Sequence, residues 1–434
     1  MNYSFPRNKI FSTLLFLQYL ILLISIVCCF RAITSIVIGG IILTGFLKNK
    51  AGRKQLLLKN KFDLFSIACL VYYGLQWIAL LYTHDRETAW KDIQLKSALL
   101  FIPLALCSTD YLNKFTVKKI ANVFILVLAA VCFYCLTIAA INFLQYHNPG
   151  VFFFHALVKP FLQHAVYFSI IIFIAAALLI EDVGHRIFIF GKTFHWALII
   201  YFSVFIFLLS SKLVICFYII FLIYYITLWI RWHIRNLLAV PILVIIASGF
   251  SCLLLITRNP VSNRFIELFR GDPALFAQQK YNPGIYFNDV QLRLVEWKFV
   301  HIILNDQHAW LIGVSPGDGQ ALLNQQYISS GMYVGDPNRD DTGFLNFNTH
   351  NELLESLLKN GIVGAIAFLF LCFAMLRFIR RLKNKAMIFI ILLLLIYSFF
   401  ESMFETQYGL VLFVFFPLFL KLSNEIPQED SPNI

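Results

Sequence analysis

Charged residues are scarce in this chain: they make up only 13% of its 434 residues, whereas 60% are hydrophobic. A soluble globular domain does not need so much apolar surface to build its core. The apolar residues form runs of about 18 or more, long enough to cross a bilayer as helices. These runs also lack the polar alternation of barrel strands, and backbone groups in lipid must bond within their own segment. An all-α polytopic membrane protein is therefore predicted.

Acidic residues are few as well, 23 against 35 Lys and Arg, and none forms a D-x-D pair or a His/Asp cluster with metal-ligand spacing. No metal site and no cofactor are therefore predicted. The nine cysteines all lie inside apolar runs, so neither a disulfide framework nor a zinc site is expected. Cys132 and Cys135 are interpreted as small apolar fillers of one helix.

The apolar runs predict about twelve membrane spans. They lie at 10–30, 33–47, 62–82, 94–108, 119–143, 162–180, 194–210, 212–230, 237–256, 361–379, 386–403 and 408–422. The first is interpreted as a retained helix rather than a removed signal peptide, because no small-residue cleavage site precedes Arg31.

The formal net charge of +12 comes from Lys and Arg gathered in every second connector between these runs. Membrane topology explains this pattern better than a nucleic-acid partner does, because basic connectors stay in the cytoplasm. Both termini are therefore predicted to be cytoplasmic in a bacterial inner membrane, with 257–349 on the outer, periplasmic side. The predicted organisation is spans one to nine over 1–256, outer loop and re-entry helix over 257–360, spans ten to twelve over 361–423, and a cytoplasmic tail over 424–434.

Turn dipeptides such as Asn282-Pro283 and Asp336-Pro337 mark the outer loop as compact and water-facing. One helix stands out within it, because Asn288 can cap a segment with Gln291 three residues on, followed by an apolar stripe at helical spacing. Arg293 and Trp297, four residues apart, share a face of that helix. A second helix is predicted to start near Thr349 and to run to Leu358.

His350 and Arg293 are the candidates for chemistry in this loop. His350 can accept a proton at ambient pH where the loop re-enters the membrane, although a histidine that anchors a helix start is an even alternative. Arg293 suits bidentate phosphate binding, whereas an ion pair with Glu296 on a solvated face is the alternative. Arg264 and Arg258 can mark the interface or bind an anion.

Lys212 lies in the short turn Ser210-Ser211-Lys212 between two long apolar runs. A cation there either snorkels or has a buried anionic partner, and the partner is favoured because an unpaired charge in the membrane costs about 3 kcal/mol. His164 and Tyr167 can line a common cavity or simply anchor the interface. The stretch from Gly313 to Gly319 fits no phosphate-loop spacing and is interpreted as turns that close the loop over the site.

Two motifs carry a family resemblance. The string Asn348-Thr349-His350-Asn351-Glu352-Leu353-Leu354, followed by Gly361 and Gly364, resembles the His-Asn re-entry motif of the O-antigen ligase and O-antigen polymerase superfamily. Arg293-Leu-Val-Glu-Trp297 and the later glycine turn resemble the Arg helix in the outer loop of that superfamily. The fold that the resemblance implies is GT-C-like.

The resemblance implies a metal-independent transferase that moves a glycan from undecaprenyl diphosphate to an acceptor hydroxyl, here a sugar of lipid A core. His350 would activate or orient the hydroxyl, and Arg293 would hold the diphosphate. The other residues expected to bind diphosphate or substrate are Lys212, Asn351, Trp297 and Arg264. Lys212 stands where the family usually has an arginine after a serine, and a lysine lacks the bidentate geometry.

The acceptor is left open by the sequence. A polymerase that extends another lipid-linked glycan and a protein O-oligosaccharyltransferase differ from the ligase only in the acceptor. A lipid-linked glycan transporter or flippase is the alternative of another class, with Lys212 lining its path. Against the transporter stand the lack of an evident inverted repeat and the placement of His350 and Arg293 outside the lipid. Donor glycan, glycan acceptor and membrane lipid are the expected partners.

Overall fold

The computed structural model describes residues 5–51, 62–108, 111–188, 190–233, 260–269, 271–336, 338, 341–380 and 382–422. Within these ranges the regular secondary structure is helical, apart from one isolated antiparallel bridge between Asp336 and Asp341. The predicted all-α class is confirmed. The predicted span at 237–256, the residue Arg258 and the predicted tail at 424–434 lie outside the described ranges.

The first part of the chain forms a series of apolar helices. They are α1 (Phe5–Val27), α2 (Arg31–Ala51), α4 (Leu64–Ala79), α5 (Arg86–Lys96), α6 (Ala98–Cys107), α7 (Lys114–Tyr146), α9 (Ala165–Gly184), α10 (Lys192–Leu208) and α11 (Lys212–His233). Three short segments join α7 to α9: η1 (Pro149–Phe152), α8 (Phe154–Val158) and η2 (Lys159–Phe161). The predicted span 94–108 is shorter than expected, because its first residues belong to the polar helix α5 and only α6 is apolar.

The predicted outer loop holds α13 (Pro260–Ile266), η3 (Glu267–Phe269), η4 (Pro273–Ala277), α14 (Asp289–Asp306) and α15 (Gly319–Ser329). The chain then returns through α16 (Glu352–Ile379), α17 (Lys385–Tyr397), η6 (Met403–Glu405) and α18 (Gln407–Leu422). Asn288 caps α14 and Gln291 closes the capping box, as the sequence predicts. Asn351 caps α16 in the same way, by accepting from the Leu354 amide.

Six described helices are long and apolar enough to cross a membrane by length and composition: α1, α2, α7, α9, α11 and α16. Four shorter apolar helices accompany them, α4, α10, α17 and α18. The chain thus has the helices of a multi-pass membrane protein. The total of twelve spans, the GT-C-like arrangement and the cytoplasmic termini stay predictions.

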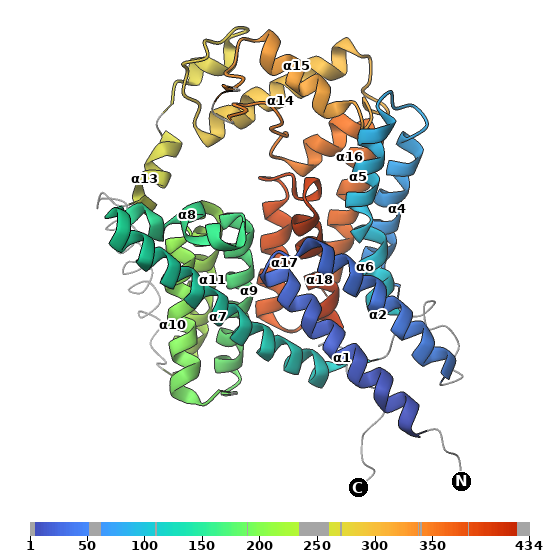
Figure 1. Ribbon diagram of the computed structural model, residues 1–434, viewed down its shortest axis with the longest axis vertical. Helices are drawn as coiled ribbons and strands as arrows, with labels where there is room; N and C mark the ends of the chain where they lie inside the picture. Colours follow the sequence, from blue (N-terminus) through green and yellow to red (C-terminus); the bar gives the residue numbers. More distant parts are fainter. Residues whose placement is uncertain are drawn as a thin grey trace.

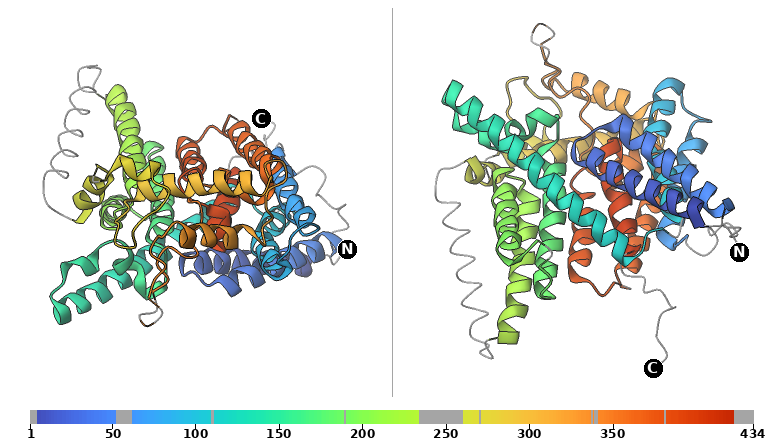
Figure 2. Two further views of the ribbon diagram at one scale, coloured as in Figure 1. Left: turned by 90° about the horizontal axis from the view of Figure 1, so that it is seen from above. Right: turned by 60° about the horizontal axis from the view of Figure 1, so that its bottom comes forward.

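The molecule has two layers (Figure 1). The apolar helices form the larger layer, in which α9, α17 and α18 lie at the centre and are largely buried. Helices α14 and α15 lie side by side above it, and the view from above shows them crossing the top of the other helices (Figure 2). This outer layer has its own core, in which Val295, Phe299 and Ile303 of α14 pack with Leu323 and Tyr327 of α15.

Helix α16 connects the two layers through a kink at Gly361. There the backbone has φ +63°, and an added Cβ would lie 2.4 Å from the carbonyl of Leu311. The kink leaves backbone groups free to bond the outer layer, so the Ile362 amide donates to the Trp310 carbonyl at 2.8 Å and the Val314 amide donates to the Leu358 carbonyl at 2.9 Å. The re-entry helix and the tenth span of the prediction are therefore two halves of one kinked helix.

Candidate active site

Five separate elements bring charged side chains together where the two layers meet. Lys212 begins α11, Arg264 lies on α13, and Asp289 and Arg293 lie on the first two turns of α14. His350 immediately precedes the cap of α16, and Glu401 lies between α17 and η6. These six residues, Lys212, Arg264, Asp289, Arg293, His350 and Glu401, are called the basic cluster below.

Asp289 is the hub of the three cations. Its Oδ2 accepts from Lys212 Nζ at 2.6 Å and lies 3.8 Å from an Arg264 nitrogen, while its backbone carbonyl accepts from Arg293 at 3.4 Å. Burial alone would raise the pKa of Asp289, but the hydrogen bond and charge of Lys212 lower it, so it is ionised. The anionic partner predicted for Lys212 is thus present, and it comes from the helix that carries Arg293.

Arg293 pairs with Glu401, whose Oε2 lies 3.9 Å from an Arg293 terminal nitrogen. Glu296, the partner that the sequence offered as an alternative, is fully buried, and no ion pair joins it to Arg293 among the described residues. The Nε atoms of Arg293 and Arg264 are both buried and have no hydrogen-bond partner among the described residues. A guanidinium is a fork of five donors, so this cluster has donors left over for an anion.

His350 faces this cluster from a strained turn. Its backbone is left-handed, with φ +47°, and its ring stacks on Phe347. Asn348 Oδ1 lies 2.8 Å from His350 Nδ1, and Glu401 Oε1 lies 3.9 Å from the same nitrogen. Burial, and then the charge of Arg293, lower the pKa of His350 to about 3, so the imidazole is neutral near pH 7.

Glu401 is a site residue that the sequence analysis missed. Its side chain is only 19% exposed. Burial raises its pKa to about 7, against the opposing charge of Arg293. A glutamate near the end of the predicted span 386–403 was a signal, because ionisable residues within spans are costly and often functional. Its contact with Arg293 was invisible, since more than a hundred residues separate the two.

A wall of aromatic rings lies beside Arg264. The Arg264 guanidinium stacks over Phe154 with 3.7 Å to the ring centroid. His155, His164 and Tyr167 continue the wall, with ring centroids 4.7 Å apart for the first pair and 5.3 Å apart for the second. His164 and Tyr167 therefore lie together as the sequence suggested, and they lie next to the basic cluster.

Two residues expected to contact substrate also make hydrogen bonds within the fold. The Asn351 amide accepts from Leu354 N at 3.1 Å and donates to the Phe399 carbonyl at 3.0 Å. Trp297 donates from Nε1 to the Thr349 carbonyl at 3.1 Å. Both residues therefore brace the turn that carries His350. The substrate contacts expected for Asn351 and Trp297 stay predictions.

The glycine turn packs away from the basic cluster. An added Cβ at Gly313 would lie 2.4 Å from the Lys359 backbone, and one at Gly317 would lie 2.2 Å from the Asp85 carbonyl. Asp318 accepts from the backbone amides of His84 and Asp85. The turn is thus a joint between the outer layer, α16 and the connector before α5, and the site itself lies elsewhere.

A second group of charges is buried between α5, α16 and η6, and it is called the buried ion cluster below. Lys96 lies 2.7 Å from Asp92 and 3.3 Å from Glu405. Lys359 lies 3.3 Å from Asp92 and 3.2 Å from Glu355, and it also bonds Glu405. The sequence analysis missed this cluster, although two of its pairs have the i,i+4 spacing of helical ion pairs.

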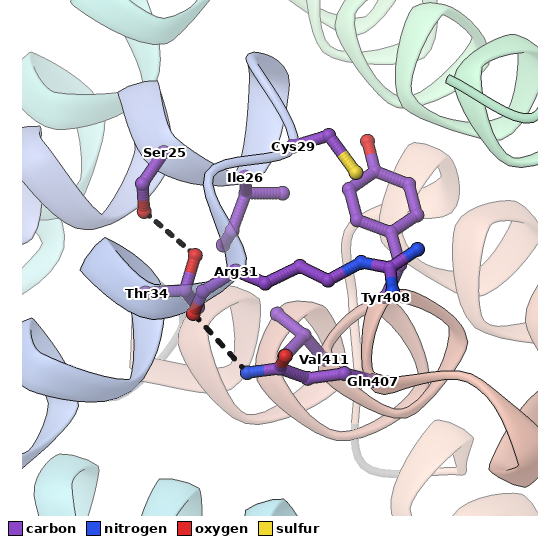
Figure 3. Close-up of a pocket in the computed structure, with 8 residues that line it drawn as sticks. All are labelled: Ser25, Ile26, Cys29, Arg31, Thr34, Gln407, Tyr408 and Val411. Carbon is purple, nitrogen blue, oxygen red and sulfur yellow. Dashed lines mark hydrogen bonds between the residues drawn. The ribbon is translucent and has the colours of Figure 1, made fainter. Parts of the chain in front are cut away.

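Two hollows elsewhere are less suited to a charged substrate. A cavity of about 10 Å³ lies between the α1–α2 turn and the start of α18, where Gln407 donates to the Arg31 carbonyl and the Arg31 side chain extends toward Tyr408 (Figure 3). This volume holds at most about one water molecule. A groove of about 330 Å³ along α14, between Trp297, Phe276 and His301, is almost entirely apolar.

A comparison with known protein families finds a match. Residues 197–369 match the family model described as O-antigen ligase. This region is similar to the O-antigen ligase family, and the match covers less than half of the chain. The match includes Lys212, Arg264, Arg293 and His350 of the basic cluster, so the family resemblance predicted from the sequence is confirmed. It supports an activity of the O-antigen ligase or polymerase type, in a chain rich in apolar helices. A search among curated proteins finds no match.

Proposed function

We propose that this protein is a metal-independent glycosyltransferase that moves a glycan from undecaprenyl diphosphate to an acceptor hydroxyl at the outer face of the inner membrane. The acceptor of choice is a sugar of lipid A core. The basic cluster is the proposed active site, with His350 as the catalytic residue and with Arg293, Arg264 and Lys212 as ligands of the diphosphate.

One observation carries the proposal: a neutral histidine stands beside three cations that have more donors than partners. Lys212, Arg264 and Arg293 come from three helices, and Asp289 and Glu401 are the two carboxylates that pair with them. The Nε atoms of both guanidinium groups have no hydrogen-bond partner in the part of the chain that the structure describes. A diphosphate is an anion of matching geometry, and fixed cations stabilise it strongly in a site of low polarity.

The proposed reaction is a single displacement. His350 accepts the proton of the acceptor hydroxyl as its oxygen bonds to the anomeric carbon of the donor. The bond between that carbon and the diphosphate oxygen breaks, and the oxygen keeps the electron pair. Arg293, Arg264 and Lys212 stabilise the charge that develops there. General base catalysis of this kind contributes about 10²- to 10⁴-fold.

Donor binding also strengthens the proposed base. In the free protein, burial and Arg293 hold the pKa of His350 low, at about 3. A bound diphosphate offsets the charge of Arg293 and adds negative charge nearby, and both effects raise the pKa of the imidazole. His350 therefore becomes an effective proton acceptor only when the donor is in place.

Reconstitution tests this proposal. The purified protein in lipid vesicles is supplied with undecaprenyl-diphosphate glycan and one of three acceptors: lipid A core, a second lipid-linked glycan or an acceptor protein. Transfer to the core supports the ligase, and transfer to one of the others identifies a polymerase or a protein glycosyltransferase. Movement of the donor across the bilayer without a new glycosidic bond would overturn the enzyme in favour of a transporter.

His350→Ala should lower transfer by about 10³-fold in this assay, because the proton acceptor is lost. The matched control is His84→Ala, since His84 lies on the outer side and its side chain is 95% exposed. The control should keep its activity. Transfer at the unchanged rate by a folded His350→Ala protein would remove His350 from the mechanism.

A further inference from the structure

The turn Asn348-Thr349-His350 contains a hydrogen-bond arrangement that determines which nitrogen of His350 carries the proton. Asn348 Oδ1 accepts from the His350 backbone amide at 2.9 Å, and the same atom lies 2.8 Å from His350 Nδ1. A backbone N–H can only donate, so the side-chain atom that faces it is the amide oxygen. An amide oxygen can only accept. The nitrogen Nδ1 must therefore carry the proton, and Nε2 has the free lone pair.

Asn348 has no competitor for this nitrogen within hydrogen-bond distance among the described residues. Glu401 Oε1 lies 3.9 Å away, which is too far for a hydrogen bond. A neutral amide holds the ring without adding a charge to it, whereas a carboxylate in its place would favour the protonated imidazolium. The side chain at position 348 therefore controls the orientation of the ring separately from its charge.

The turn itself is held in place from several sides. The Phe347 carbonyl accepts from Gln320 Nε2 at 3.0 Å and from the Tyr327 hydroxyl at 3.2 Å. The Thr349 carbonyl accepts from Trp297, and the Thr349 hydroxyl donates to Glu355 at 2.9 Å. A left-handed conformation at a residue other than glycine is uncommon and persists where the surroundings fix it. The backbone of His350 is thus held in place, and its ring contacts Asn348 through Nδ1 and stacks on Phe347.

We propose that Asn348 is a positioning residue for the transfer reaction, which keeps the proton of neutral His350 on Nδ1 and directs Nε2 toward the acceptor hydroxyl. This inference rests on the proposed function, because it gives His350 the role of proton acceptor. It assigns to Asn348 the part of the orienting third group that catalytic histidines use in other active sites.

Two substitutions test the inference. Asn348→Leu keeps the size of the side chain and removes the acceptor oxygen, so kcat should fall by about 10- to 100-fold while the KM for the donor stays near that of the wild type. Asn348→Asp keeps an oxygen in place and should retain most of the kcat. It also adds a negative charge beside the ring, so the rising limb of the pH profile should move to higher pH.

The matched control for folding is Asn282→Leu. Asn282 accepts from the Gly284 amide at 3.0 Å, the same local turn bond in the same outer layer but without a histidine. This variant should keep its kcat and its pH profile. If Asn348→Leu and Asn282→Leu lower kcat equally, or if Asn348→Leu leaves kcat unchanged, Asn348 has no positioning role.

A spectroscopic measurement separates this inference from the proposed function. In protein labelled with ¹⁵N-histidine, the difference from His350→Gln assigns the ring nitrogens of His350. A protonated Nδ1 in the wild type that becomes mixed or unprotonated in Asn348→Leu supports the inference even if no acceptor is glycosylated. An unprotonated Nδ1 in the wild type, or the same tautomer in both proteins, overturns it even if transfer is observed.

Discussion

The basic cluster includes His350, just before α16, and the buried ion cluster includes Glu355 and Lys359 on α16. The two clusters nevertheless differ in how their positive charges are paired with carboxylates. In the buried ion cluster, Lys96 and Lys359 face the three carboxylates Asp92, Glu355 and Glu405, and the two lysine side chains are 1% and 6% exposed. In the basic cluster, the described residues place three cations against two carboxylates, and two guanidinium nitrogens have no hydrogen-bond partner among these residues.

This difference suits the buried ion cluster to a structural role and the basic cluster to binding a ligand. Charges that are buried with partners hold the outer ends of α5, α16 and η6 together, and removing one partner leaves the others uncompensated. Buried charges with too few partners lower the stability of the folded protein, but a bound ligand of opposite charge can supply the missing partners. The two clusters should therefore respond to neutralisation with opposite signs of stability change.

The largest expected effect is on the buried ion cluster. Lys359→Met should destabilise the protein by about 3 to 5 kcal/mol, because it leaves Asp92, Glu355 and Glu405 with less positive charge in a buried site. Thermal unfolding in detergent measures the change. The control Lys91→Met removes an exposed partner of Glu87 and should change stability by less than about 1 kcal/mol. Equal effects of the two substitutions would contradict the structural role.

Arg293→Lys should reduce transfer by about 100-fold with little change in thermal stability. A lysine keeps the charge but loses the planar fork that contacts Glu401 and has donors left for a diphosphate. Steady-state kinetics with the lipid-linked donor checks this expectation. Arg86→Lys, at the exposed start of α5, is the matched control. Near wild-type turnover in Arg293→Lys would mean that Arg293 acts only through its charge.

Glu401→Gln should stabilise the protein at pH 8 by about 1 to 3 kcal/mol and should lower transfer. The pKa of Glu401 is raised from its ordinary value of 4.5 to about 7, so the folded protein binds this proton more tightly than the unfolded chain does. Its contribution to stability is present below about pH 4.5 and is lost as the pH rises through about 7. Thermal midpoints at pH 5 and pH 8 measure the effect, which should vanish at the lower pH.

The counterpart in the other cluster is Glu405→Gln, which should destabilise the protein because Glu405 pairs with both buried lysines. If Glu405→Gln stabilised the protein, or Glu401→Gln destabilised it at pH 8, the expected opposite response of the two clusters would be wrong.

The smallest effect is expected for Lys212→Arg. Lys212 contacts Asp289 through one short hydrogen bond, so the site uses it here as a single positive charge. An arginine supplies the same charge, and transfer should change by less than about 10-fold. Lys212→Met, which removes the charge, should lose much more activity. A kinetic assay of both variants decides whether charge or shape matters at this position.

Much of the fold was predictable because it depends on local patterns. The apolar runs predicted the long helices, and Asn288 marked where α14 begins. The second outer helix was predicted to start near Thr349, whereas α16 begins at Glu352 after its cap Asn351. The span predicted at 94–108 was wrong in its first residues, since the pairing of Lys96 with Asp92 and Glu405 keeps a polar helix there. Pairing across elements is a long-range property that a local hydropathy pattern does not contain.

The candidate site was also predictable only in part. The residues His350, Arg293 and Lys212 were recognisable because each is a chemically unusual side chain at a membrane boundary, and their motifs resembled those of a family. The sequence did not show that these residues lie close together, or that Glu401 contacts Arg293, because they lie on separate elements that come together only when the chain folds. The structure adds that the Asn351 side chain caps α16 and bonds the Phe399 carbonyl, which the motif alone did not show.

The sequence by itself thus determined the helical class of the fold and the resemblance to a family, because composition, periodicity and short motifs are local. Only the tertiary structure decided that Asp289 lies beside Lys212 and Arg264, that Arg293 pairs with Glu401, and that Asn348 contacts Nδ1 of His350. Distances between side chains on different helices depend on how the two layers pack at the Gly361 kink, and no single segment of the chain encodes that packing.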